Sequence, residues 1–243
     1  MEKQLAIATI TWARDPEEEA LLRSSLPHLA ATGLPVFITD GGSGSSFISF
    51  LKSFSQFTVL TTEANGVWAQ AGNSIRKASD LGAEFILYTE PDKKDFFLFA
   101  LADFLRTIAD KPQAGIILAS RSQQAFATFP AFQQMTETTI NNCCSEITGN
   151  RQDYTYGPFL MNRKLVPSLD LAKEDIGWGW RPYVFAIAQR LGLSISNVTG
   201  DFKCPESQRQ DTAPERIYRM KQLQQNIHGM VLSGTVDLKE IPV

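Results

Sequence analysis

The sequence is poor in cysteine and histidine, which excludes several kinds of site. Its 243 residues include three cysteines and two histidines. Cys143 and Cys144 are adjacent and Cys204 is distant, so there is neither a disulfide framework nor the Cys-x-x-Cys spacing of a zinc site. His28 and His228 alone supply too few imidazoles for a histidine-based metal centre.

Long runs of charge and long apolar runs are also lacking. The 23 basic and 26 acidic residues give a net charge of −3 with no long basic segment, so the electrostatic footprint of a nucleic-acid-binding protein is missing. Only a few apolar residues separate Gln4 from Arg14, which excludes a secretory signal or a transmembrane segment there. We therefore expect a cytoplasmic protein with no nucleic-acid partner.

What the sequence does contain is a regular alternation of strand and helix patterns. Short apolar segments typical of buried strands end near residues 10, 39, 60 and 88, and helical patterns separate them. This alternation predicts an α/β fold with a mainly parallel central sheet flanked by helices. After Arg121 the rhythm changes, so we expect a mixed C-terminal part. We predict one domain, 1–243, made of a first half (1–120), a second half (121–212) and a C-terminal helix and tail (213–243).

Two carboxylates follow the fourth predicted strand directly. The apolar run Phe85–Tyr88 leads into Thr89 and then Glu90-Pro91-Asp92. In an open α/β sheet, ligands bind beyond the carboxyl ends of the strands, so Glu90 and Asp92 are expected at a ligand or metal site. The alternative is an ordinary turn in which Asp92 is the N-cap of a helix over residues 93–109.

A second acid ends the second predicted strand. Asp40 is followed by Gly41-Gly42-Ser43-Gly44-Ser45, and such glycines let a backbone approach a ligand closely. The segment lacks the Lys-Ser/Thr ending of a phosphate-binding loop and does not match Gly-x-Gly-x-x-Gly. A flexible strand-to-helix turn is the alternative interpretation.

Four separated stretches resemble one family, the GT-A-type nucleotide-sugar glycosyltransferases. Val36–Ser43 resembles the strand that ends in an acid-Gly-Ser turn, and Phe85–Asp92 is similar to the strand that ends in Asp-x-Asp. Asn65-Gly66 followed by Gly72-Asn73 resembles the segment before that strand. Tyr156–Arg163 with Gly177-Trp178-Gly179-Trp180 resembles the acceptor-side strand and its loop. The resemblance implies a Rossmann-like GT-A fold.

For the donor, the resemblance implies a UDP- or GDP-sugar whose diphosphate is neutralised by Mg or Mn. Asp92 matches the metal-contacting acid, and Glu90 stands where the family has the first Asp of Asp-x-Asp. Oxygen ligands of this type suit hard divalent cations. Asp40 matches the acid that contacts the nucleoside, and the donor neighbourhood is expected to include Thr11, Asn73 and Lys77.

For the acceptor, the resemblance implies a base and a sugar platform near the Gly-Trp-Gly loop. The family commonly has an acid after this loop, where this sequence has Arg181-Pro182. Asp175, or else Glu174, is the candidate base, with a solvated loop acid as the alternative. The candidate acceptor contacts are Trp178 and Trp180, which could instead be core residues, and Asp153 and Tyr154, which could instead cap a strand.

The function that we expect is transfer of a sugar from a nucleotide-diphosphate donor to an acceptor hydroxyl. The first alternative is a non-catalytic GT-A-like module that binds a nucleotide or a glycan. The second alternative is a nucleotidyltransferase, although Thr11–Asp15 lacks the glycine that usually follows the first strand in that class.

Overall fold

The protein, described here by a computed structural model, groups into two compact units. The first contains Met1–Lys111 and Pro158–Val166, and the second contains Pro112–Gly157 and Pro167–Val243. The structure describes residues 5–241; the predicted domain's ends at 1–4 and 242–243 lie outside this range. The predicted grouping of 1–243 as one domain, with its three sections, stays a prediction.

The first unit contains five paired strands. They are β1 (Leu5–Thr11), β2 (Val36–Asp40), β3 (Phe57–Leu60), β4 (Phe85–Tyr88) and β6 (Phe159–Asn162), in the order β3-β2-β1-β4-β6. The first four are parallel to their neighbours, and β6 is antiparallel to β4. In the register of β1 and β2, Thr11 pairs with Asp40. The carboxyl ends of β1, β2 and β4 therefore lie along one edge.

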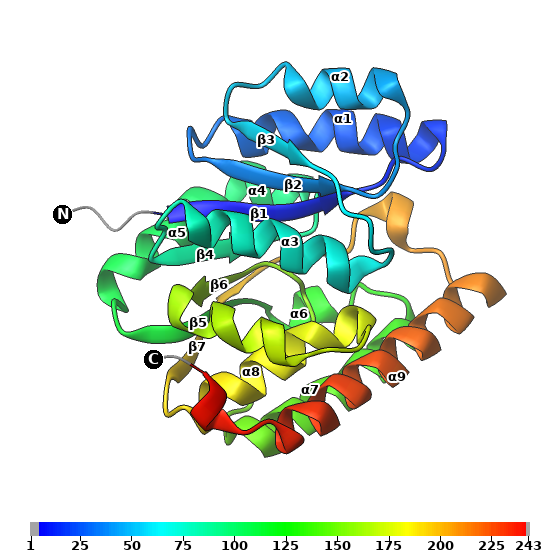
Figure 1. The fold of residues 1–243 in the computed structure, drawn as a ribbon. Coiled ribbons are helices and arrows are strands. Elements are labelled where there is room, and N and C mark those ends of the chain that lie inside the picture. Colours follow the sequence, from blue (N-terminus) through cyan, green and yellow to red (C-terminus); the bar gives the residue numbers. More distant parts are fainter. Residues whose placement is uncertain (1–4, 242–243) are drawn as a thin grey trace. The chain divides into compact units, whose positions relative to one another are not determined.

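Five helices accompany these strands. They are α1 (Pro16–Ala30), α2 (Ser45–Lys52), α3 (Val67–Asp80), α4 (Lys94–Phe99) and α5 (Leu101–Asp110). α3 packs on β1 and β2, and α1 contacts α4 (Figure 1). α1 begins with a side-chain cap, because the Asp15 carboxylate accepts a hydrogen bond from the backbone N–H of Glu18 and Pro16 fits the first helical position.

The segment after β4 differs from the alternative expectation for Asp92. The helix begins at Lys94, its N-cap position is Lys93, and no side chain caps it. A break at Ala100, with φ −130°, then separates α4 from α5. The expectation of one helix over 93–109 capped by Asp92 is therefore wrong, and the carboxylate is not used as a helix cap.

The second unit pairs two strands and packs three long helices together. Its strands β5 (Ala114–Arg121) and β7 (Ser194–Gly200) are parallel, and its helices are α6 (Gln123–Phe126), α7 (Ala131–Thr148), α8 (Trp180–Arg190) and α9 (Ala213–Thr235). α7, α8 and α9 contact one another. Short 3-10 segments complete the chain: Arg163–Leu171, Gly177–Gly179, Glu206–Gln208 and Leu238–Glu240.

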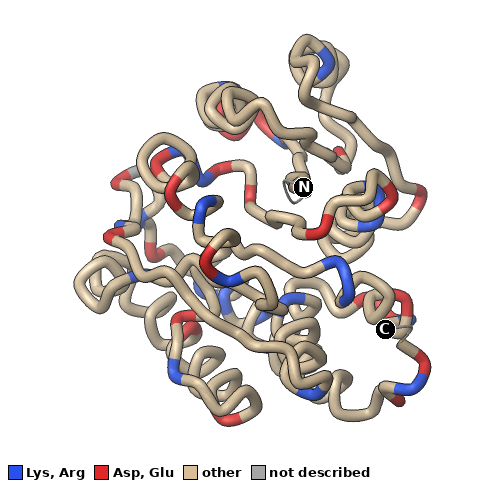
Figure 2. The backbone as a smooth tube through the Cα atoms, turned by 90° about the vertical axis from the view of Figure 1, so that its left-hand side faces the viewer, with Lys and Arg blue, Asp and Glu red and all other residues tan. Residues whose placement is uncertain are grey.

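The expected fold class is confirmed: mainly parallel strands flanked by helices, with an antiparallel strand in the later part. Lys and Arg alternate with Asp and Glu along the backbone, and Figure 2 shows no long segment of one sign. Among residues 5–241, no helix combines the length and the apolar character needed to cross a membrane.

Candidate functional site

The Asp40 carboxylate organises the turn after β2. Its Oδ1 accepts the backbone N–H groups of Gly42 at 2.9 Å and Ser43 at 2.7 Å. Its Oδ2 accepts the hydroxyls of Ser43 at 2.7 Å and Thr11 at 2.8 Å. Gly42 has φ +116°, a conformation that favours glycine. Asp40, only 8 % exposed, thus fixes the turn and ties it to the end of β1.

An exposed tryptophan lies beside this turn. Trp12 directly follows β1 and is 52 % exposed, and the Arg14 guanidinium lies 5.6 Å from its ring centroid. A Cβ on Gly41 would come within 3.1 Å of the Trp12 Cβ and 2.5 Å of the Gln70 amide nitrogen, so a side chain there would require Gln70 and Trp12 to shift. We did not single out Trp12 from the sequence; an aromatic residue immediately after the first strand was the available signal.

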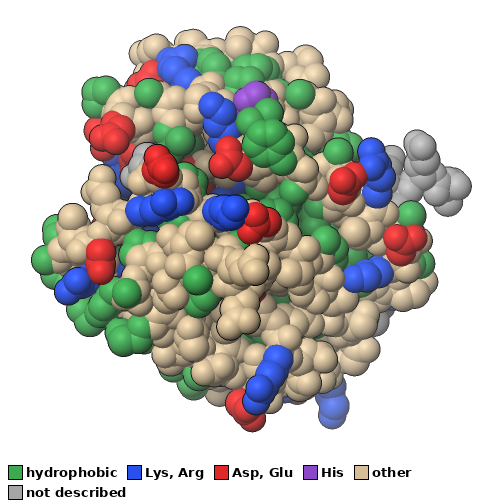
Figure 3. Space-filling view, turned by 180° about the vertical axis from the view of Figure 1, so that it is seen from behind, with side chains coloured by type: hydrophobic (Ala, Val, Ile, Leu, Met, Phe, Trp, Pro, Cys, Tyr) green, Lys and Arg blue, Asp and Glu red, His purple; other side chains and the backbone are tan. Residues whose placement is uncertain are grey.

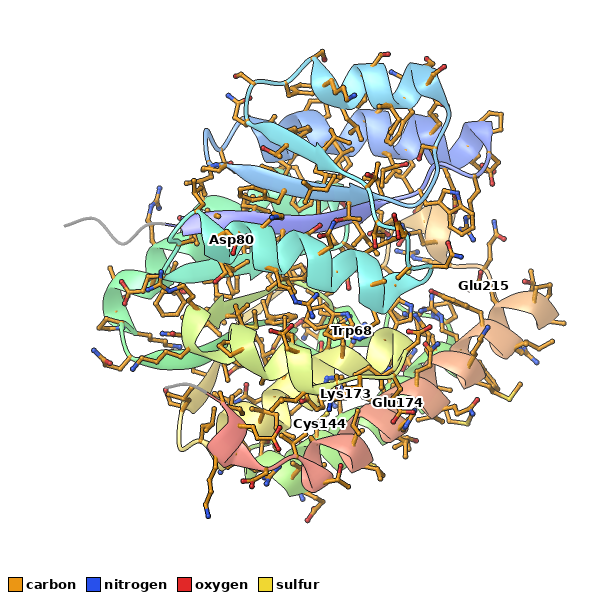
Figure 4. All side chains as sticks on the ribbon, in the orientation of Figure 1. Trp68, Asp80, Cys144, Lys173, Glu174 and Glu215 are labelled. Atoms are coloured by element: carbon orange, nitrogen blue, oxygen red, sulfur yellow. The ribbon has the colours of Figure 1, made fainter. Side chains whose placement is uncertain are left out.

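Asn73 joins this edge, but Lys77 does not. The Asn73 amide donates to the Thr39 hydroxyl at 3.2 Å and to the Thr61 carbonyl at 3.3 Å. The helix of a βαβ unit runs back toward the amino ends of the strands, and Figure 4 shows Asp80 at that far end of α3. The Lys77 ammonium pairs with the Asp80 carboxylate there, at 3.2 Å. Lys77 therefore lies away from the strand ends that carry Thr11 and Asp40.

Glu90 and Asp92 follow β4, beside the end of β1. The Thr89 backbone bridges the two strands, because its N–H donates to Ala8 at 3.2 Å and its carbonyl accepts the Thr9 hydroxyl at 2.7 Å. The Asp92 side chain is 29 % exposed, and the Lys93 ammonium lies 3.9 Å from its carboxylate. The Asp92 carboxylate is accessible enough to meet a ligand, and the Lys93 ammonium adds positive charge beside it. Glu90 is half-buried, and its Oε2 atom is shielded from solvent.

Glu90 and Asp92 could hold a divalent cation only together with a bound ligand. In the part of the chain that the structure describes, no group of three or more His, Cys, Asp or Glu side chains could hold a metal by itself. Mg²⁺ is commonly held by one or two carboxylates together with phosphate oxygens and water. Glu90 and Asp92 offer this pair of carboxylates, so the remaining ligands would come from a diphosphate and water.

In the second unit, Asp153 belongs to a buried ion cluster. Its carboxylate accepts two hydrogen bonds from the Arg121 guanidinium, at 2.7 and 2.9 Å, and the same guanidinium binds Glu137 at 2.6 Å. Burial opposes the charged carboxylate, but Arg121 outweighs it and lowers the pKa of Asp153 to about 2. Asp153 is therefore a structural anchor, and the expectation that it contacts an acceptor is not supported.

Tyr154 and Trp180 are also parts of the core. Tyr154 is 3 % exposed, its hydroxyl donates to the Asn150 carbonyl at 2.7 Å, and burial raises its pKa to about 12. Trp180 is fully buried in the first turn of α8. A ring without exposed surface cannot stack on a sugar, so the core-packing alternative holds for Trp180.

The loop that carries Glu174, Asp175 and Trp178 is held against α9. The Trp178 backbone N–H donates to Gln225 at 3.2 Å, and its indole N–H donates to the Tyr218 hydroxyl at 3.0 Å. The Asp175 carboxylate accepts the Gly177 N–H at 2.9 Å. Glu174 lies beside α9 in Figure 4, where its carboxylate is 3.3 Å from the His228 imidazole. Trp178 is half-buried and keeps part of its ring accessible.

The predicted site residues therefore form two groups, one in each unit. The first unit brings together Thr11, Asp40, Asn73, Glu90 and Asp92 along one edge and adds Trp12. The second unit keeps Glu174, Asp175 and Trp178 on one loop, whereas Asp153, Tyr154 and Trp180 serve its core.

Comparisons with known proteins agree with this architecture. Glucosyl-3-phosphoglycerate synthase from Mycobacterium tuberculosis, solved with Mn²⁺, UDP-glucose and phosphoglyceric acid, superposes with a TM-score of 0.66 at 12 % identity, over 97 % of this chain and 81 % of that chain. The fold is shared with these synthases. Mannosyl-3-phosphoglycerate synthase from Rubrobacter xylanophilus gives a TM-score of 0.63 at 12 % identity, over 96 % of this chain and 76 % of that chain. No protein-family model and no curated protein sequence matches this chain.

The expected GT-A fold is confirmed by these superpositions, which extend over nearly the whole chain. At 12 % identity, likeness to solved structures establishes the fold alone. The chemistry of this chain has to be argued from its own residues.

Proposed function

We propose that this protein is a glycosyltransferase that moves a sugar from a nucleotide-diphosphate donor to an acceptor hydroxyl. One observation carries the proposal: the Asp40 turn and the Glu90-Pro91-Asp92 turn lie at the carboxyl ends of β2 and β4, on either side of β1. Ligands of open α/β sheets bind at this edge. The superposing M. tuberculosis synthase was solved with Mn²⁺ and UDP-glucose, which are a metal and a donor of the expected classes.

The donor half of the site would act as follows. Trp12 offers an exposed ring on which a nucleobase can stack, beside the turn that the Asp40 carboxylate fixes by accepting the Gly42 and Ser43 N–H groups. Glu90 and Asp92 would hold the divalent cation with the diphosphate. The cation supplies positive charge that stabilises the diphosphate as it leaves. Lys93, 3.9 Å from Asp92, adds to that charge.

The transfer itself requires a base and a bound acceptor. The acceptor oxygen forms a bond to the anomeric carbon, the bond from that carbon to the diphosphate oxygen breaks, and the base takes the hydroxyl proton. Asp175 or Glu174 is the proposed base, and the accessible part of Trp178 is the proposed platform for a sugar ring. The three cysteines are free thiols, as expected for a reducing compartment, so we place the reaction in the cytoplasm.

Release of nucleoside diphosphate tests the proposal. UDP-glucose and GDP-mannose are incubated with Mn²⁺ and a panel of hydroxyl acceptors that includes 3-phosphoglycerate, the acceptor named with the M. tuberculosis enzyme. We expect release that depends on protein, metal and one acceptor, and a loss of at least tenfold for Asp175→Asn, Glu174→Gln or both. Lys173→Gln, beside the two acids, is the matched control and should keep its activity.

A non-catalytic binding module is the second candidate, and three contacts around the candidate base favour it. Asp175 caps its own loop, and Glu174 pairs with His228. Arg181, at the position where the resemblance implies an acid, bonds the Tyr154 carbonyl at 3.2 Å. If nucleotide sugars bind and no donor is consumed with any acceptor, this candidate is correct and the enzyme proposal is wrong.

A further inference from the structure

The helix α9 carries a second apolar stripe opposite its buried side. Its buried residues are Gly229, Met230 and Ser233, which face α7, α8 and the Gly-Trp-Gly loop. On the other side, Ile217 is 64 % exposed, Met220 is 50 % exposed and Val231 is 64 % exposed. Within residues 5–241, no element covers these three side chains.

The spacing of these exposed residues follows a helix-pairing pattern. At 100° per residue, Ile217, Met220, Gln224 and Val231 lie within about 60° of one another and opposite the buried side. A recurrence at steps of three, four and seven residues is the pattern with which one helix packs on another. Figure 3, seen from behind, shows apolar side chains gathered at the left edge of the view, where the first half of α9 lies.

We propose that this stripe binds a second copy of the chain, with the two α9 helices antiparallel around a two-fold axis near Gln224. The stripe is self-complementary about that residue, because Ile217 and Val231 are each seven positions away. An antiparallel pair therefore places Ile217 of one copy against Val231 of the other copy. It also brings the two Gln224 side chains together at the axis. Such isologous contacts are the usual way in which identical chains form closed dimers.

The charges on the stripe's flank support the same arrangement. Lys221 and His228 lie on one side of the stripe, three residues before and four residues after Gln224. In the antiparallel pair, Lys221 of each copy faces the His228 position of the other, where the Glu174 carboxylate lies 3.3 Å from the imidazole. Lys221 makes no ion pair with any described residue, and Glu174 is 56 % exposed. The proposed interface therefore adds a Lys221–Glu174 ion pair on each side.

The oligomeric state in solution tests this proposal. We expect analytical ultracentrifugation of the wild-type protein to show a concentration-dependent species of twice the 27.0 kDa chain mass. Ile217→Glu and Val231→Glu should each shift the protein to monomer, because a charge would be buried at the interface. Phe99→Glu places the same charge at a 79 % exposed apolar site in the first unit and should leave the dimer intact. Circular dichroism verifies that each variant is folded.

Two further variants test the geometry. Gln224→Cys should give a disulfide-linked dimer under mild oxidation, because the two copies of this residue meet at the axis, whereas Leu98→Cys, at a 43 % exposed site, should not. Lys221→Glu should weaken the dimer by a factor of about 2–5, and adding Glu174→Lys should restore it. If Gln224→Cys cross-links efficiently but the double variant Lys221→Glu, Glu174→Lys does not recover the dimer, the proposed Lys221–Glu174 ion pair is wrong.

Two outcomes would overturn the dimer itself. One is a monomer at every concentration that the protein tolerates. The other is a monomer that co-floats with phosphatidylserine-containing vesicles and loses this binding with Ile217→Glu, which would make the stripe a membrane contact. These readouts do not depend on donor binding or catalysis, so the proposal and the proposed enzymatic function can fail separately.

Discussion

The hydroxyl of Thr11 donates a 2.8 Å hydrogen bond to the carboxylate of Asp40, its register partner on the neighbouring strand. This bond joins the ends of β1 and β2 at the edge where the donor site is proposed. The same carboxylate accepts two backbone N–H groups and the Ser43 hydroxyl, so four donors converge on one side chain. Asp40 thus shapes the turn at which we propose that the nucleotide binds, and its carboxylate carries a negative charge there.

Removing this carboxylate should destabilise the turn. Asp40→Ala leaves the Thr11 hydroxyl and two backbone N–H groups without their acceptor, and we expect a loss of about 1–3 kcal/mol in the free energy of unfolding. Thr11→Val removes only one of these bonds and should cost about 1 kcal/mol. Urea unfolding compares the two. If Asp40→Ala costs no more than Thr11→Val, the carboxylate does not hold the turn.

Trp12 should contribute to nucleotide affinity rather than to stability. Stacking of a base on an aromatic ring contributes about 1–3 kcal/mol, so Trp12→Ala should weaken UDP binding by roughly tenfold, and Trp12→Phe should recover part of the loss. Titration calorimetry with UDP and Mn²⁺ gives both values. Phe99→Ala, at another exposed aromatic ring, is the control. Equal affinities for Trp12→Ala and the control would exclude stacking on Trp12.

The buried cluster around Arg121 should dominate the stability of the second unit. The guanidinium binds Asp153 and Glu137 and lies 4.4 Å from the Phe129 ring centroid. Arg121→Met leaves two buried carboxylates uncompensated, and we expect a loss of about 3–5 kcal/mol. If the triple variant Arg121→Met, Asp153→Asn, Glu137→Gln loses less free energy of unfolding than Arg121→Met, the loss in the single variant comes from the unpaired charges. Equal losses would contradict that account.

The same cluster gives stability a defined pH dependence. The folded pKa of Asp153, about 2, lies below the unfolded value of about 3.9, so its contribution is fully present above the unfolded pKa and disappears as pH falls toward 2. We expect the free energy of unfolding to fall more steeply below pH 4 in the wild-type protein than in Asp153→Asn. Urea titrations between pH 2.5 and 6 compare the slopes, and parallel curves would contradict the assignment.

Replacing each of two glycines of α9 by alanine should have opposite effects on the stability of the protein. A Cβ on Gly229 would lie 1.9 Å from the Gly179 carbonyl oxygen, whereas nothing lies within 4 Å of one on Gly234. Gly229→Ala should therefore cost about 1–3 kcal/mol by overpacking the Gly-Trp-Gly loop, and Gly234→Ala should gain about 0.5–1 kcal/mol from helix propensity. Thermal unfolding distinguishes them. A stable Gly229→Ala variant would show that the loop can move away from α9.

The sequence predicted the residues at the strand ends of the first unit better than those of the second unit, for physical reasons. Parallel strands bring their carboxyl ends together whatever their exact registers, so Asp40 and Glu90-Pro91-Asp92 could be placed on one edge from the alternation of elements alone. Lys77 was misplaced because it lies ten residues into α3, by which point the helix has run back toward the other edge.

On the acceptor side, local chemistry did not reveal which side chains are buried. Asp153 looked like an available acid, but its partner Arg121 is 32 residues earlier and meets it only in the folded chain. Trp178 and Trp180 are two residues apart, yet the helix begins between them and turns Trp180 into the core. Such long-range pairings and burials leave no local signal in a single sequence.

The most direct test of the central claim is the melting temperature with and without donor and metal. With UDP- or GDP-sugar and Mn²⁺ well above Kd, we expect a rise of about 5 °C or more. Asp92→Ala should remove the Mn²⁺-dependent part of this rise, whereas Asp95→Ala, at an exposed acid in the first turn of α4, should retain it. The absence of stabilisation by any common nucleotide diphosphate or nucleotide sugar would contradict the account.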